Sequence, residues 1–254
     1  MKSTVLITGS ASGIGAASAL QFAQLGWRVV VNYSRSKAEA EAVADACRAA
    51  AGEALLVQAD VAQDVDCRRL VAETIAKFGR LDALVNNAGV TKFAALKDLE
   101  ALSADDFLRL TQVNVASMFQ MARAAAPHLR EACGSVVNVT SRSAASGAGS
   151  SIAYAASKGA GNTLTLSLAR ALSPEVRVNA VAPGFVTTAW HDRQAEGETG
   201  RALHAKQAAA YAARAALQKT VSAEEVADAI VWLTTGARSV TGQIINVDAG
   251  ASLG

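Results

Sequence analysis

The chain has 254 residues, of which 51% are hydrophobic and 18% charged, and its formal net charge is +2. Its 24 basic and 22 acidic residues are nearly balanced, which argues against a nucleic-acid partner. No apolar segment reaches the roughly 18 residues needed to span a bilayer, and residues 1–9 lack the apolar stretch of a signal peptide. We therefore expect a cytoplasmic protein without a membrane partner. Cys47, Cys67 and Cys133 are widely spaced and are expected to be small, buried thiols in a reducing compartment.

Short apolar runs alternate with longer helical patterns along the chain. The predicted strands cover residues 4–7, 28–32, 55–58, 83–85, 135–139, 176–181 and 243–247, and the predicted helices 13–25, 37–51, 65–78, 104–126 and 152–172. The strand runs are continuously apolar, as is typical of strands buried on both faces. The alternation predicts an α/β fold: one Rossmann-type domain over residues 1–254, with a doubly wound parallel sheet of seven strands and helices on both faces. The polar segment at about 185–222 interrupts this rhythm and is expected to form a substrate lid.

The first predicted strand leads into a glycine-rich loop, Thr8-Gly9-Ser10-Ala11-Ser12-Gly13-Ile14-Gly15. Glycines allow a tight turn and a close approach of the backbone to a pyrophosphate, and the helix that follows offers free N–H groups. A turn with incidental glycines is the alternative. Because the loop both follows a strand and opens a helix, it predicts a dinucleotide site.

The spacing Thr-Gly-x-x-x-Gly-x-Gly resembles that of the short-chain dehydrogenase/reductase family, and the resemblance extends along essentially the whole chain. Asn86-Asn87-Ala88-Gly89 follows the fourth strand, and Pro183-Gly184 with Thr188 follows the sixth. The residues that match the family's catalytic positions are Asn114, Ser141, Tyr154 and Lys158. The pattern is most similar to the 3-oxoacyl-acyl-carrier-protein reductase branch and its carbonyl-reducing and sugar-alcohol neighbours.

Tyr154 and Lys158 are four residues apart, so both lie on one face of the predicted helix. An ammonium group and an oxidised nicotinamide nearby are expected to lower the pKa of the tyrosine. In the reductive direction Tyr154 would donate its proton to the developing alkoxide, while Ser141 hydrogen-bonds the same oxygen. The resemblance also implies that Lys158 binds the nicotinamide ribose and that Asn114 orders a water that relays protons to the lysine. Ser143 is the alternative serine, but its spacing to Tyr154 fits the family less well.

The residues after the second strand are expected to select the cofactor. NAD enzymes usually carry an acid there, whereas this chain continues from Asn32 through Tyr33, Ser34 and Arg35. Arg35 and Ser34 could bind a 2′-phosphate, which favours NADP(H), with NAD(H) as the alternative. Ser12 departs from many NADP-dependent relatives, which have Arg or Lys at that position. The full set of expected cofactor contacts is Gly9, Ser12, Gly13, Ile14, Gly15, Asn32, Ser34, Arg35, Asp60, Val61, Asn87, Ala88, Gly89, Tyr154, Lys158, Pro183, Gly184, Val186 and Thr188.

The expected substrate is a small molecule with a carbonyl or secondary alcohol group. The candidate lining residues are Lys92, Phe93, Arg142, Ser143, Ala144, Phe185 and Trp190. Arg142 and Lys92 either meet an anionic substrate or are solvent-facing charges. Basic residues typical of family members dedicated to acyl carrier protein are missing at 132–133 and 173–174, so a free carbonyl substrate is at least as well supported.

The histidines His128, His191 and His204 are scattered, which predicts no metal site. The resemblance implies that the helices carrying Asn114 and Tyr154 pair across a two-fold axis, so we expect a homotetramer or at least a dimer. The competing functions are an NAD-preferring sugar, polyol or alcohol dehydrogenase, a dehydratase or epimerase on the same scaffold, and a non-catalytic dinucleotide sensor.

Overall fold

The computed structural model describes residues 2–188 and 197–253, and seven parallel strands form one sheet in the order β3-β2-β1-β4-β5-β6-β7. The strands are β1 (Thr4–Ile7), β2 (Arg28–Tyr33), β3 (Ala54–Gln58), β4 (Ala83–Asn86), β5 (Ser135–Val139), β6 (Arg177–Pro183) and β7 (Ile244–Val247). In this order β1 lies between β2 and β4, and Leu6 pairs with Val30 on one side and Leu84 on the other. The prediction of a doubly wound, seven-stranded parallel sheet is confirmed.

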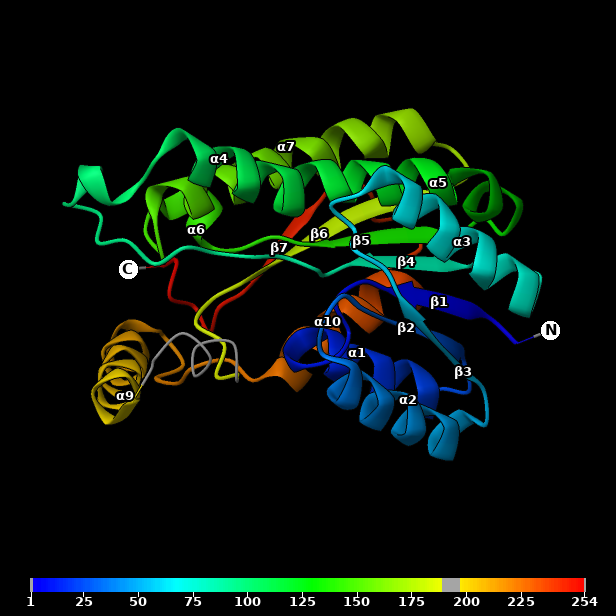
Figure 1. Cartoon of the computed structure of the whole chain (residues 1–254), viewed down its shortest axis with the longest axis horizontal. Helices are drawn as coiled ribbons and strands as arrows, with labels where there is room; N and C mark the ends of the chain where they lie inside the picture. Colours follow the sequence, from blue (N-terminus) through cyan, green and yellow to red (C-terminus); the bar gives the residue numbers. More distant parts are fainter. Residues whose placement is uncertain (1, 189–196, 254) are drawn as a thin grey trace.

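Helices cover both faces of the sheet (Figure 1). On one face lie α1 (Gly13–Gln24), α2 (Lys37–Ala51) and α10 (Ala223–Thr235), and on the other lie α3 (Asp64–Phe78), α5 (Ser117–Glu131) and α7 (Ile152–Leu172). Strand side chains alternate between the two faces. Val5 and Ile7 therefore join the core under α1 and α10, while Leu6 joins the core under α3 and α5. All three are fully buried, as the continuous apolar pattern predicted.

The helical region predicted from residue 104 is longer than expected and has an irregular centre. It consists of α4 (Ala104–Thr111), a π-helical segment η2 (Gln112–Ala116) and α5. A capping box between Ser103 and Asp106 starts it. In η2 the Ser117 N–H donates to the carbonyl of Gln112, five residues earlier. Such single-turn π segments are frequent at functional sites, and Asn114 lies in this one.

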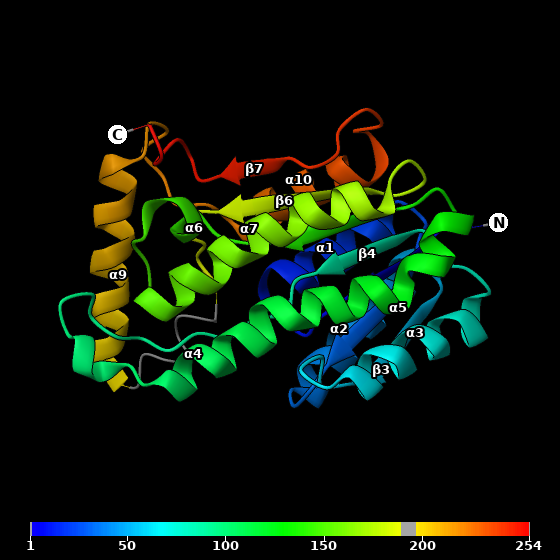
Figure 2. The ribbon, with the colours of Figure 1, turned by 90° about the horizontal axis from the view of Figure 1, so that it is seen from above.

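Four helical segments were not predicted from the sequence: η1 (Leu99–Ala101), α6 (Ser143–Ser146), α9 (Gly197–Arg214) and α10. The α10 helix begins at a capping box between Ser222 and Glu225, a signal that the sequence does contain. The α9 helix falls in the segment predicted as a lid and lies beyond the carboxyl ends of the strands (Figure 2). Its alanine-rich sequence has no clear apolar stripe, so periodicity gave no sign of it.

The prediction that all three cysteines are buried is wrong for one of them. Cys47 and Cys67 are buried, but Cys133 is exposed. Cys133 lies in the turn after α5, with φ of 49° in the left-handed region. Within the described residues, no helix is long and apolar enough to cross a membrane.

Candidate active site

The glycine loop between β1 and α1 is shaped by contacts that exclude larger residues. Gly9 has φ of +61°, and a Cβ there would lie 2.9 Å from the Cα of Ala88. A Cβ on Gly15 would lie 2.5 Å from the Asn87 amide nitrogen and 2.7 Å from the Gly9 carbonyl oxygen. The loop therefore packs tightly on the end of β4, and only glycine fits at these two positions. The N-terminus of α1 opens beside it, as anion binding requires.

Thr8 and Asn87 fasten this loop to β4. The Thr8 hydroxyl accepts hydrogen bonds from the backbone N–H groups of Asn87 and Ala88, both at 3.0 Å. The Asn87 side-chain amide donates to the carbonyls of Thr8 (2.9 Å) and Gly9 (3.0 Å). Because these contacts occupy its donors, Asn87 positions the loop through its side chain.

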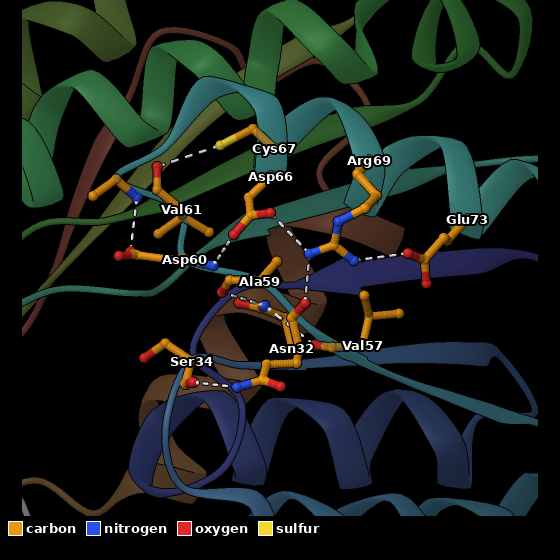
Figure 3. Close-up of polar contacts among 12 residues, drawn as sticks. Asn32, Ser34, Val57, Ala59, Asp60, Val61, Asp66, Cys67, Arg69 and Glu73 are labelled. Atoms are coloured by element: carbon orange, nitrogen blue, oxygen red, sulfur yellow. Dashed lines mark hydrogen bonds and ion pairs between the residues drawn. The ribbon is translucent and has the colours of Figure 1, made fainter.

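Asn32, at the carboxyl end of β2, points into the sheet. Its side chain is buried, its oxygen accepts from the N–H of Gly9 at 3.0 Å, and its amide donates to the carbonyl of Ala59 at 3.1 Å. Ser34 and Arg35 follow and are exposed. The Gln58 side chain donates to the Ser34 carbonyl at 3.0 Å and holds this segment against β3 (Figure 3). Of the residues predicted to select the cofactor, the structure thus places Ser34 and Arg35 at the surface and Asn32 behind them.

The loop after β3 carries the predicted adenine contacts Asp60 and Val61. The Asp60 N–H donates to Asp66 at 2.8 Å, and Arg69 bridges the same carboxylate and the carbonyl of Gln58 (Figure 3). These bonds tie the loop to the first turns of α3. The sequence analysis did not single out Asp66 or Arg69, although an acid in a first helical turn is a recognisable signal.

The structure brings Ser141, Tyr154 and Lys158 together beside the ends of β5 and β6. Ser151 caps α7 by accepting from the Tyr154 N–H at 3.2 Å, which fixes the helical turn that carries the tyrosine. The Tyr154 hydroxyl is hydrogen-bonded with Ser141. The Lys158 ammonium donates to the Val139 carbonyl at 2.8 Å and lies 5.7 Å from the centre of the Tyr154 ring.

Burial shifts both titratable groups toward their neutral forms. It raises the pKa of Tyr154 to about 12, against the opposing effect of the Ser141 hydrogen bond. It lowers the pKa of Lys158 to about 8. The predicted lowering of the tyrosine pKa is therefore not found among the protein's own groups, because desolvation of the phenolate is the larger effect. Tyr154 is a protonated phenol at neutral pH and is ready to donate its proton.

Asn114 is fully buried and connects two parts of the site. Its side chain accepts from the N–H of Val90 at 2.8 Å and donates to the Val90 carbonyl at 2.9 Å. It also donates to the Ser157 hydroxyl at 3.0 Å, and Ser157 donates to the Tyr154 carbonyl at 2.8 Å. The side chain thus joins the loop after β4 to the helix that carries the tyrosine. Sequence reasoning missed Ser157, which has no motif of its own beyond its place beside Lys158.

The residues predicted to line the substrate pocket have different contacts in the structure. Lys92 forms an ion pair with Asp106 at 2.6 Å, and Phe93 is exposed. The Arg142 guanidinium lies over the ring of Tyr211 from α9. Phe185 contacts the same ring, with the ring centres 5.8 Å apart. Trp190 lies outside the described residues.

The remaining predicted positions lie around the same edge of the sheet. The Pro183 carbonyl accepts from the Arg142 N–H at 2.9 Å, and Gly184 donates to the Val247 carbonyl at 2.9 Å. Val186 is bridged to Val221, and the Thr188 side chain lies near Gly13. Ser143, the alternative serine, donates its backbone N–H to the Ser141 hydroxyl at 3.1 Å. Ala144 is in α6, and among the described residues no group of His, Cys, Asp and Glu could hold a metal ion.

Comparison with known proteins supports the resemblance of the chain to the short-chain dehydrogenase/reductase family. A sequence profile described as short chain dehydrogenase matches residues 3–199. The chain belongs to the short-chain dehydrogenase/reductase family and is an oxidoreductase that acts on a carbonyl or CH–OH group.

Individual relatives cover the chain almost completely. It is 43% identical over 249 residues to a Streptomyces violaceoruber protein named as ketoacyl reductase 2 of the granaticin polyketide synthase, covering 98% of this chain and 95% of the relative. It is 32% identical to the 3-oxoacyl-acyl-carrier-protein reductase of Staphylococcus epidermidis, covering 98% and 99%. A solved short-chain dehydrogenase/reductase from Burkholderia xenovorans superposes with a TM-score of 0.91 at 41% identity, covering 100% and 99%. The structure of ElxO with NADP bound superposes with a TM-score of 0.87 at 26% identity over the whole of both chains.

Proposed function

We propose that the protein interconverts a carbonyl and a secondary alcohol with NADP(H), using Tyr154 as general acid and base. The observation that carries this proposal is the hydrogen bond between Tyr154 and Ser141, with Lys158 one helical turn away and the glycine loop on the same edge of the sheet. The close packing of Gly9 and Gly15 fixes the glycine loop against the end of β4, and the N-terminus of α1 beside it suits a pyrophosphate. The nicotinamide cofactor supplies or accepts the hydride when it is bound.

In the reductive direction Ser141 and Tyr154 both direct hydroxyl groups toward the oxygen of the substrate carbonyl. Ser141 holds and polarises this oxygen, and Tyr154 donates a proton to it as negative charge develops. A phenol with a pKa of about 12 stays protonated until that charge appears. The buried Lys158 ammonium, 5.7 Å from the ring, stabilises the phenolate left after transfer. Asn114 keeps the helix and the loop after β4 in register through Ser157 and Val90.

We assign the preference for NADP(H) to Ser34 and Arg35. Both are exposed at the carboxyl end of β2, no acid stands beside them in the chain, and a guanidinium suits a 2′-phosphate. ElxO, a structural neighbour, is described with NADP bound, which supports this choice. Arg35→Ala should raise KM for NADPH about tenfold and leave KM for NADH nearly unchanged. Lys37→Ala is the matched control, because Lys37 already pairs with Glu41 at 3.6 Å. Equal effects on both cofactors would contradict the assignment.

Tyr154→Phe tests the catalytic assignment directly. The variant keeps the ring but loses the acidic proton, so turnover should fall by about 10²- to 10⁴-fold while NADPH binding persists. Turnover is followed as NADPH consumption with a panel of ketones, sugars and acyl thioesters. A non-catalytic sensor would consume no NADPH, and a dehydratase or epimerase would convert its substrate without net consumption. Either result would refute the reductase function.

We also propose that the chain forms a homotetramer or a dimer through α4, α5 and α7. Leu108, Phe119 and Leu166 expose large apolar side chains on these helices, at 67%, 44% and 38%. A partner subunit packed there would bury them. Light scattering that finds a monomer at micromolar concentration would contradict this. The cytoplasmic location remains a prediction that cell fractionation can test.

A further inference from the structure

Arg142 is the residue directly after Ser141, and its backbone is fixed at the edge of the sheet. Its N–H donates to the Pro183 carbonyl at 2.9 Å, which ties it to the end of β6. Its side chain reaches α9, where the guanidinium carbon lies 5.8 Å from the centre of the Tyr211 ring. The side chain thus connects the chain position next to Ser141 with the helix in the predicted lid.

Tyr211 is a rigid support for this cation. It is buried, and its hydroxyl donates to the Asp248 carbonyl at 2.7 Å. Phe185 packs on the ring, and the space where a Cβ of Gly184 would lie is occupied by the tyrosine hydroxyl. An arginine stacked on an aromatic face is held in orientation while its N–H donors, which lie in the guanidinium plane, stay available.

The guanidinium donors of Arg142 have no acceptor in the part of the chain that the structure describes. No described carboxylate forms an ion pair with it, whereas Lys92, the other candidate for an anionic substrate, is neutralised by Asp106 at 2.6 Å. The side chain of Asp248, near the same tyrosine, accepts from the Gly250 N–H at 3.0 Å and is not paired with the guanidinium. Arg142 is only partly exposed, so an anion bound there would be shielded from water.

We propose that Arg142 is a specificity-determining residue that binds a carboxylate of the substrate, so that the enzyme acts on oxo acids and the corresponding hydroxy acids. The planar fork of arginine matches a carboxylate in a bidentate pair. Because Arg142 directly follows Ser141, the carboxylate belongs to the same molecule as the reacting carbonyl and lies a few bonds from it. This inference rests on the proposed reductase function and narrows its substrate class.

The test compares 2-, 3- and 4-oxo acids (2-oxobutanoate, acetoacetate and levulinate) with their methyl esters, by NADPH consumption. Each pair keeps the same ketone and replaces the carboxylate by its uncharged methyl ester. For the best pair, the wild-type enzyme should have a kcat/KM for the acid about 10- to 100-fold above that for the ester, as expected for a charge-assisted hydrogen-bonded pair. Arg142→Gln should reduce this ratio to about one, and Arg142→Lys should keep part of it. Lys92→Gln is the control and should leave the ratio as in the wild type.

The outcomes separate the inference from the proposed function. If the methyl esters are reduced but no acid is preferred, or if Arg142→Gln keeps the wild-type ratio, the carboxylate site is wrong and the reductase function stands. If no carbonyl compound consumes NADPH, the reductase function fails and the inference fails with it. Tyr211→Leu is a second variant, which removes the support but keeps the charge. It should lower the acid-to-ester ratio severalfold, and an unchanged ratio would refute the role of the ring.

Discussion

The buried charge of Lys158 should destabilise the folded protein. Its side chain is buried, with 2% of the residue exposed, and burial lowers its pKa from 10.5 to about 8. Each pH unit of such a shift corresponds to about 1.4 kcal/mol, so the charged amine costs about 3 kcal/mol of folding free energy at pH 7. The hydrogen bond to the Val139 carbonyl at 2.8 Å offsets about 1 kcal/mol of this cost. Lys158→Met, which keeps most of the side-chain volume, should therefore raise the free energy of unfolding by about 2 kcal/mol.

The pH dependence gives this prediction a definite sign. Between pH 8 and 10.5 the unfolded lysine is protonated while the folded one is neutral, so wild-type stability from this group rises with pH. The variant lacks this rise, and its advantage should be largest at pH 7 and shrink as the pH approaches 10. Denaturant unfolding without cofactor, at pH 7, 8, 9 and 9.5, measures the difference. Lys97→Met, which changes an exposed lysine, is the control and should show no such trend. A variant less stable than the wild type at every pH, by a constant amount, would refute the reasoning.

Three further substitutions test the packing of the site. Gly184→Ala would place a Cβ 1.9 Å from the Tyr211 hydroxyl oxygen. The free energy of unfolding should therefore fall by about 1–3 kcal/mol, and the activity should fall as well. Tyr211→Phe in the same background should restore part of the loss. Asn32→Asp would place a carboxylate oxygen against the Ala59 carbonyl, where the amide donor now lies 3.1 Å away. We therefore expect the free energy of unfolding, measured with denaturant, to fall by about 2–4 kcal/mol, with no gain in NADH use. A change below about 0.5 kcal/mol would contradict this. Gly159 lies inside α7, and a Cβ added there would have the Ala144 carbonyl oxygen, 3.7 Å away, as its nearest neighbour. Gly159→Ala should therefore raise the melting temperature, in line with about 0.5–1 kcal/mol of added stability.

Most of the elements near the site could be read from local patterns. The helices predicted at 37–51 and 152–172 have the bounds of α2 and α7, and the strand runs lie within two residues of those observed. The helix that carries Tyr154 and Lys158 begins at the Ser151 cap and is rich in alanine and leucine, and the spacing of four places both residues on one face. The lid helix α9 and the exposure of Cys133 were not predictable in this way, because neither depends on a pattern of the neighbouring sequence.

Local sequence therefore determines the strands, most of the helices and the positions of the motif residues, because apolar periodicity and capping act over a few residues. It does not determine what the polar side chains do. Asn32 binds Gly9, 23 residues away, Asn114 binds Ser157, 43 residues away, and the Tyr211 hydroxyl binds a carbonyl 37 residues away. A buried amide or hydroxyl must find a hydrogen-bond partner, and the packing of the sheet alone decides which distant group that is. The same packing pairs Lys92 with Asp106 and places Arg142 over the Tyr211 ring, with no acceptor for its guanidinium among the described residues.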